Sequence, residues 1–189
     1  MYELEDKDEV AAFYEPGSDR AVAVVCLAIV ENRLTDLLKA AMRKDEKTQE
    51  ELFNPSGPIG SLGTKIKLAY MLGLIHADVY SDLRLVTKIR NEFAHSVRIT
   101  SFDEPSIKRR ISSLHAFQVW KFLEQQQSAA LTDPNADSNA KLQAQILRDE
   151  LSAWRDTFKM CLRLYIWKLV MSTKRVNQWS AARPEPTPE

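Results

Sequence analysis

Hydrophobic residues recur every three or four positions along most of this chain, which is the spacing of one face of an α-helix. One regular stretch places its apolar positions at Val79, Leu83, Val86, Ile89 and Phe93. Residues 19–43 carry two such stripes, so we expect that helix to be buried on more than one side. The alternation typical of strands is nowhere sustained, and the pattern therefore predicts an all-α fold.

The periodic segments together predict a single-domain antiparallel bundle of about five to six helices. Besides the two helices above, they cover residues 1–14, 62–73, 104–123 and 141–174. The polar segment 125–140 is expected to be a mobile connection between helices. In this interpretation residues 1–175 form the domain, and the proline-rich residues 176–189 form a disordered tail.

The charge of the chain narrows the classes of function. Lys plus Arg and Asp plus Glu number 26 each, so the net charge is zero. Proteins that coat nucleic acid without sequence preference depend on excess positive charge, so this balance counts against that class. The sequence has neither the spacing of a helix-turn-helix nor a basic recognition helix, and direct DNA reading is not expected.

Metals, cofactors and membranes are not expected either. The two cysteines, Cys26 and Cys161, stand alone in apolar helical segments, which is typical of small buried residues and not of a metal or redox site. The glycine-rich segment 54–65 has its glycines and lysine in the wrong order for a phosphate-binding P-loop. No run of 18 apolar residues is present, and the first residues are acidic and polar. We expect a cytoplasmic protein.

The sequence RNEFAH at 90–95 carries the strongest candidate chemistry. A metal-independent ribonuclease needs a base near neutral pKa and a fixed cation for the phosphorane charge, and His95 and Arg90 supply these two groups. Asn91, one helical turn before His95, could orient the imidazole or hold a phosphate oxygen. On a straight helix Arg90 and His95 point about 140° apart, so they would converge only through a helix end or a dimer.

The motif formed by Arg90, Asn91 and His95 resembles the R-x4–6-H signature of the HEPN superfamily, whose members are small all-α bundles. The resemblance implies a dimeric, metal-independent endoribonuclease or toxin, although other members lack activity. It makes RNA a possible partner and Arg90, Asn91 and His95 the catalytic residues.

A longer stretch, GPIGSLGTKIKLAYMLGLIHADVYSDLRLVTKIRNEFAH at 57–95, is similar to the mannitol operon repressor family. That family shows a GPLG-type loop, a helix of the form KLxYxLGxI and a short turn into a further helix. The segment AIVENRLTDLL at 28–38 resembles its buried helix with a glutamate at mid-length. The resemblance implies an all-α regulator of a carbohydrate operon that acts through a protein partner. We therefore favour a regulator, with a protein partner or a homodimer, over an enzyme.

A third possibility is that the polar residues only hold the fold together, because networks of ion pairs imitate functional sites. Glu31 could be exposed or pair with Arg33, Lys39 or another surface base, or it could face Arg90 or His95 across a pair of helices. Further candidates for a binding or supporting role are Asn32, Lys65 and His76.

Overall fold

The computed structural model describes residues 17–181, and this part of the chain forms one all-helical domain with eight α-helices and no strand. The helices are α2 (Asp19–Ala41), α3 (Glu46–Phe53), α4 (Leu62–Met71), α5 (Ala77–His95), α6 (Pro105–Ser112), α7 (His115–Thr132), α8 (Ser138–Ser152) and α9 (Trp154–Ala181). The all-α prediction is confirmed, whereas the expected number of five to six helices is too low. The helix predicted within residues 1–14 lies outside the described residues.

The additional helices have two origins. Some lie in polar segments that were expected to be loops, and others arise because one predicted helix is interrupted within its apolar stripe. The expected mobile connection at 125–140 is wrong over most of its length, because α7 continues to Thr132 and α8 starts at Ser138. Gln and Ala favour helix, so this polar segment needs no apolar stripe to continue α7. Asp137 caps α8 by accepting from the backbone N–H groups of Asn139 and Ala140.

Two predicted helices are each divided in two. The segment expected at 104–123 breaks at Ser113 and Leu114, and the segment expected at 141–174 breaks at Ala153, whose backbone is extended. The second half of the latter, α9, runs on to Ala181, which lies inside the part of the chain predicted as a disordered tail. Residues 182–189 lie outside the described residues.

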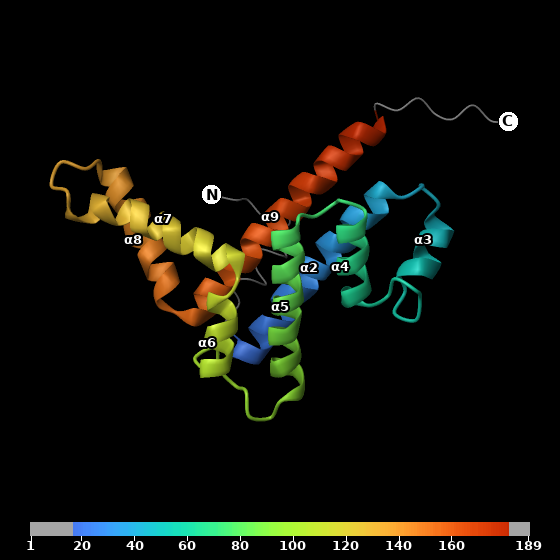
Figure 1. Cartoon of the computed structure of the whole chain (residues 1–189), viewed down its shortest axis with the longest axis horizontal. Helices are drawn as coiled ribbons and strands as arrows, with labels where there is room; N and C mark the ends of the chain where they lie inside the picture. Colours follow the sequence, from blue (N-terminus) through green and yellow to red (C-terminus); the bar gives the residue numbers. More distant parts are fainter. Residues whose placement is uncertain (1–16, 182–189) are drawn as a thin grey trace.

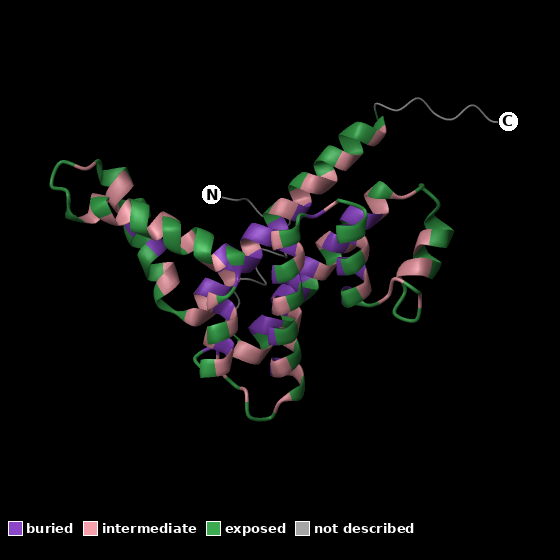
Figure 2. Cartoon of the chain, viewed as in Figure 1, coloured by how far each residue is buried: buried purple, intermediate pink, exposed green. Residues whose placement is uncertain are grey.

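The centre of the molecule is α2, which packs against α9, α5 and α4 (Figure 1). Its two apolar stripes are buried as predicted, and so is the whole stripe of α5 from Val79 to Phe93. Figure 2 shows the buried residues concentrated where α2, α5 and α9 meet. No helix in this described part of the chain is long and apolar enough to cross a membrane.

Charged residues fasten the start of α2 to elements that come much later in the chain. Asp19 accepts a 2.6 Å hydrogen bond from Nε of Arg155 on α9 and a 2.8 Å hydrogen bond from the backbone N–H of Phe102. Arg20 donates to the backbone carbonyl of Ser96, at the end of α5, over 2.8 Å. These contacts fix where α5 ends and the 96–104 loop begins.

The connection from α4 to α5 depends on Gly73, which has a φ of +69°. Its N–H bonds to the carbonyl of Tyr70, and the N–H of Leu74 bonds to that of Ala69. This is the Schellman arrangement, in which glycine follows the end of the helix because a left-handed backbone strains other residues. The predicted end of this helix at Gly73 is confirmed.

Two helical parts extend away from the packed centre (Figure 1). The α7–α8 hairpin projects on one side and buries little, since Ala116 is the only buried residue of α7 and Ala144 and Leu147 are those of α8. The last turns of α9 project on another side. The last buried residue of α9 is Leu169, although the helix continues to Ala181.

Candidate functional site

The predicted motif lies on the last turns of α5, where two of its three residues share a surface hollow. Asn91 and His95 are four positions apart and therefore on the same helix face. Both line an open hollow of about 440 Å³, together with Lys88, Glu92, Ser96 and Arg110. Arg90, the third motif residue, is half-buried and does not line the hollow.

The cation in this hollow comes from another helix. Arg110 of α6 forms a charge-assisted hydrogen bond with Glu92, while its Nε atom is buried without a hydrogen-bond partner among the described residues. Lys88 is exposed on α5, one turn before Asn91 and Glu92. The chain thus places two cationic side chains, a carboxamide and an imidazole around one concavity, although the arginine is not the one that the motif suggested.

Glu31 and Lys65, two of the predicted supporting residues, form an ion pair between α2 and α4. The Lys65 Nζ lies 2.8 Å from the Glu31 Oε1, and Lys65 is only 6 % exposed. The structure therefore shows a base other than the four residues named from the sequence, which were Arg33 and Lys39 or Arg90 and His95. Asn32, the neighbouring candidate, is exposed on α2. A buried ammonium needs such a partner, which explains a glutamate in the middle of an apolar helix.

A buried carboxylate that the sequence analysis missed joins three helices. Asp82 of α5 is 1 % exposed and accepts hydrogen bonds from His115 Nδ1 at 2.9 Å, from the backbone N–H of Ala116 at 3.1 Å and from the hydroxyl of Tyr165. It thereby caps the start of α7 and ties it to α5 and α9. The available signal was its position in the α5 stripe, three residues after Val79.

This carboxylate also affects the titration of its neighbours. Burial raises the pKa of Tyr165 far above its ordinary value, and the charge and hydrogen bond of Asp82 raise it further. Burial raises the pKa of the Cys161 thiol, and the charge of Asp82 acts in the same direction. Both groups therefore stay protonated, and Tyr165 acts as a hydrogen-bond donor to Asp82.

His76, the remaining candidate, is exposed and lines a cleft between the α4–α5 turn and the second half of α9. The cleft has a volume of about 290 Å³. Its apolar lining consists of Leu74, Ile75, Val79, Trp167, Leu169 and Met171, and its polar lining of His76, Lys168, Ser172 and Arg175. No carboxylate belongs to this described lining, whose charged side chains are Lys168 and Arg175.

One cation of that lining, Lys168, is already paired with a carboxylate. Lys168 donates a 3.0 Å hydrogen bond to Asp78 on the first turn of α5. Burial raises the pKa of Asp78, but the hydrogen bonds from Lys168 and from backbone N–H groups outweigh it, and the pKa lies below its ordinary value. Asp78 therefore stays ionised and offers no free acid for proton transfer.

Metal binding finds no support in residues 17–181. They contain no group of three or more His, Cys, Asp or Glu side chains that could hold a metal ion. Cys26 and Cys161 are free thiols and both are buried, as predicted. The described sites are suited to binding by charge, hydrogen bonds and apolar contact.

Comparison with known proteins identifies relatives of this chain. The model of a family described as mannitol repressor matches residues 9–170. Mannitol operon repressors of Escherichia coli strain K12 and of Escherichia coli O6:H1 are each 27% identical over 100 residues, which is 51% of this chain and 51% of the relative. The chain thus spans about half the length of the curated relatives it matches.

Two solved structures share the fold. A chain in the X-ray structure of the MtlR–HPr complex from Escherichia coli is 25% identical, with a TM-score of 0.62 over 86% of this chain and 96% of that chain. The crystal structure of YggD from Shigella flexneri, a possible transcriptional regulator, has a TM-score of 0.64 over 88% of this chain and 99% of that chain. Its identity is 14%, so it shows the fold alone.

Proposed function

The chain belongs to the mannitol repressor family, and from this premise we propose that it is a transcription regulator that acts by binding another protein. The observation that carries the proposal is its likeness, along 86% of its length, to a structure solved as a complex with HPr. We propose that an HPr protein is the partner of this chain as well. Its zero net charge and the lack of a helix-turn-helix spacing support contact with protein over direct reading of DNA.

The surface of the molecule also supports binding of a protein. Large apolar side chains that are well exposed include Met71, Leu72, Phe122, Leu142 and Trp179. Of these, Met71 and Leu72 are adjacent at the end of α4. Exposed apolar residues that gather in a patch are characteristic of interaction sites, and Met and Trp are enriched in the centres of protein interfaces.

The direct test is calorimetry with the full-length chain and the HPr protein encoded in the same genome. We expect a saturable complex, and we expect no sequence-specific shift of operator DNA by the chain alone at physiological salt. Specific operator binding without reproducible binding to HPr or any other protein would contradict the proposal.

A ribonuclease of the HEPN type is the second candidate, because Asn91 and His95 line the same hollow as Lys88 and Arg110. In a ribonuclease of this kind His95 would be the base. Arg110 would supply the cation beside the phosphate, the role that the sequence motif assigned to Arg90. Incubation with RNA in EDTA tests it: cleavage should disappear with His95→Ala and persist with His76→Ala. Equal cleavage by the two variants, or none by the unaltered chain, would exclude His95 as a catalytic residue.

The homodimer and the cytoplasmic location expected from the sequence remain predictions that belong to this proposal. Light scattering on the purified chain would decide the first, and cell fractionation would decide the second.

A further inference from the structure

We infer that two copies of this chain associate through the outward face of α8, with the two α8 helices antiparallel across a two-fold axis. The inference rests on the proposed function in one respect, because the homodimer belongs to it, and it adds the surface and the contacts. It does not depend on the identity of the protein partner.

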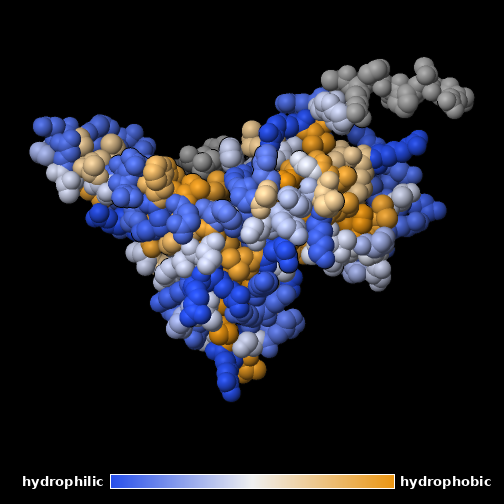
Figure 3. Space-filling model, viewed as in Figure 1, coloured by the Kyte–Doolittle hydropathy of each residue, from blue (hydrophilic) through white to orange (hydrophobic). Residues whose placement is uncertain are grey.

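The α7–α8 hairpin exposes large apolar side chains although it buries few residues. Those that are 46–59 % exposed are Val119, Phe122, Leu142 and Ile146. Figure 3 shows hydrophobic side chains at the surface of this projecting arm, among hydrophilic ones. Helices in proteins gain most of their stability from packing an apolar face, so a second copy that covers the hairpin would stabilise it.

The exposed apolar residues of α8 belong to one face of the helix. The exposed members of this outward face are Leu142, Gln145, Ile146 and Asp149. Their spacing of three and four residues places them side by side, and the helical turn places them opposite the buried side of α8. One side of α8 therefore packs against the rest of the molecule, and the opposite side presents two aliphatic residues.

The charges along the outward face match those of a second copy. Lys141 lies four residues before Gln145, and Asp149 lies four residues after it. When two α8 helices pair antiparallel about Gln145, each Lys141 comes opposite Asp149 of the other copy. Each Leu142 then lies beside Ile146 of the other copy, so the apolar residues meet at the centre and an ion pair flanks them on each side.

Within the described part of the chain, the contacts of both charged groups are with neutral ones. Lys141 Nζ donates to the carbonyl of Pro134 over 3.1 Å, and Asp149 Oδ1 accepts from the Gln145 amide over 2.8 Å. Pairing across the two-fold axis therefore displaces no ion pair. Complementary charge of this kind fixes the register and orientation of an association.

The size of the hairpin predicts a weak dimer. With its 15 residues α8 is about 22 Å long, and two adjacent helices are about 20 Å wide. Even if the full width took part, each copy would contribute roughly 450 Å², and the total would stay below the roughly 1,200 Å² at which stable complexes begin. We therefore expect a reversible dimer with a dissociation constant in the micromolar range.

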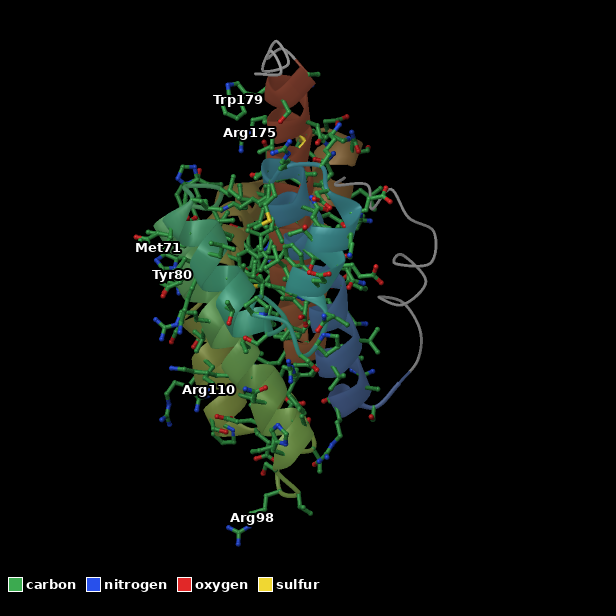
Figure 4. The ribbon with its side chains drawn as sticks, turned by 90° about the vertical axis from the view of Figure 1, so that its right-hand side faces the viewer. Met71, Tyr80, Arg98, Arg110, Arg175 and Trp179 are labelled. Atoms are coloured by element: carbon green, nitrogen blue, oxygen red, sulfur yellow. The ribbon has the colours of Figure 1, made fainter. Side chains whose placement is uncertain are left out.

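A substitution on the outward face, with a matched control elsewhere on the surface, tests the inference. Ile146→Asp places a carboxylate among the apolar residues at the centre of the paired faces. Met71→Asp introduces the same side chain at the exposed end of α4, outside the hairpin (Figure 4). Sedimentation equilibrium at micromolar to submillimolar concentrations measures the dimer, and circular dichroism verifies that each variant remains helical. We expect Ile146→Asp to weaken dimerisation by about tenfold or more, and Met71→Asp to stay within about twofold of the unaltered chain.

Reversed charges test the antiparallel register. Lys141→Asp and Asp149→Lys each turn an attraction into a repulsion that the two-fold axis repeats, so each should weaken dimerisation by about tenfold. The double variant restores the pairs with their signs exchanged and should return to within about threefold of the unaltered chain. Added salt should weaken the dimer of the unaltered chain and strengthen that of each single variant. Arg98→Asp, in the 96–104 loop at the lower end of the molecule in Figure 4, is the control and should change dimerisation by less than about twofold.

Three results would overturn the inference. They are a chain that stays monomeric at all concentrations, equal dimerisation by Ile146→Asp and the unaltered chain, and a double charge variant that remains as weak as the single ones.

Calorimetry of the same variants with HPr separates this inference from the proposed function. A monomeric chain that loses HPr binding through Ile146→Asp would assign the outward face to HPr, which overturns the inference and leaves the proposed function standing. A dimer that Ile146→Asp dissociates, in a chain that does not bind HPr, would support the inference and overturn the choice of HPr as the partner.

Discussion

At the scale of single residues, the described interior contains three buried polar side chains, and each has a partner. Lys65 pairs with Glu31, Asp82 accepts three hydrogen bonds, and the hydroxyl of Thr157 donates to the carbonyl of Leu151. Buried polar groups are expected to be satisfied in this way. A single polar position in an apolar stripe therefore indicated a contact, although not the identity of its partner.

The Glu31–Lys65 pair gives a prediction at this scale. Removing the carboxylate with Glu31→Gln leaves a buried ammonium without its counter-charge, and we expect a loss of roughly 2–3 kcal/mol in the free energy of unfolding. Lys65→Met removes the buried charge and keeps the packing volume, so it should cost less, roughly 1 kcal/mol or below. Urea unfolding of the two variants measures the difference. Equal losses would mean that the pair contributes through packing alone.

At the scale of the elements, the sequence placed the helices that have an apolar stripe and missed the breaks between them. The end of α4 near Gly73 was predicted, because a local signal, the glycine with its left-handed backbone, sets it. The break before α7 had no such signal. The α7 N–H of Ala116 is capped by Asp82, more than thirty residues earlier in the chain, so only the folded structure determines where α7 begins.

The loop before α4 gives a prediction at the scale of an element. A Cβ added at Gly57 would lie 2.4 Å from the carbonyl oxygen of Glu51 and 2.5 Å from that of Leu52, so the backbone would have to move. We expect Gly57→Ala to lower the free energy of unfolding by roughly 2 kcal/mol.

Gly63 is the matched control, because a Cβ there meets nothing closer than the Ser61 hydroxyl at 3.9 Å. It lies within α4, so Gly63→Ala should raise stability by roughly 0.5–1 kcal/mol. Thermal unfolding of both variants tests the pair. A tolerated Gly57→Ala would show that the loop does not need this close backbone approach.

At the scale of the whole molecule, the buried protonated groups predict a loss of stability in alkali. Burial raises the pKa of Cys26 to about 11, partly offset by the charge of Lys159, and the pKa values of Cys161 and Tyr165 are raised as well. Their ordinary values are 9.0 for the thiols and 10.0 for the phenol. Above pH 9 the unfolded chain therefore binds fewer protons than the folded one, and stability falls as pH rises.

A group that is deprotonated in the unfolded chain and still protonated in the folded one lowers the free energy of unfolding by at most about 1.4 kcal/mol per pH unit. Urea unfolding should be measured from pH 7 to pH 11. The contribution of these three groups to the free energy of unfolding should stay constant up to about pH 9 and decline above it. Tyr165→Phe should make the decline shallower above pH 10, and replacing the thiols should make it shallower from pH 9. An unchanged slope in all variants would show that these groups do not titrate on unfolding.

The sequence by itself determined the fold class, the buried faces of α2 and α5 and the turn at Gly73, because spacing and backbone preference act over a few residues. It also determined that Asn91 and His95 share a helix face. Only the tertiary structure decided the partner of Glu31, the three bonds of Asp82, the arginine that lines the same hollow as His95 and the cleft beside α9. Each of these depends on which distant helices meet, and that is set by how the apolar faces pack together.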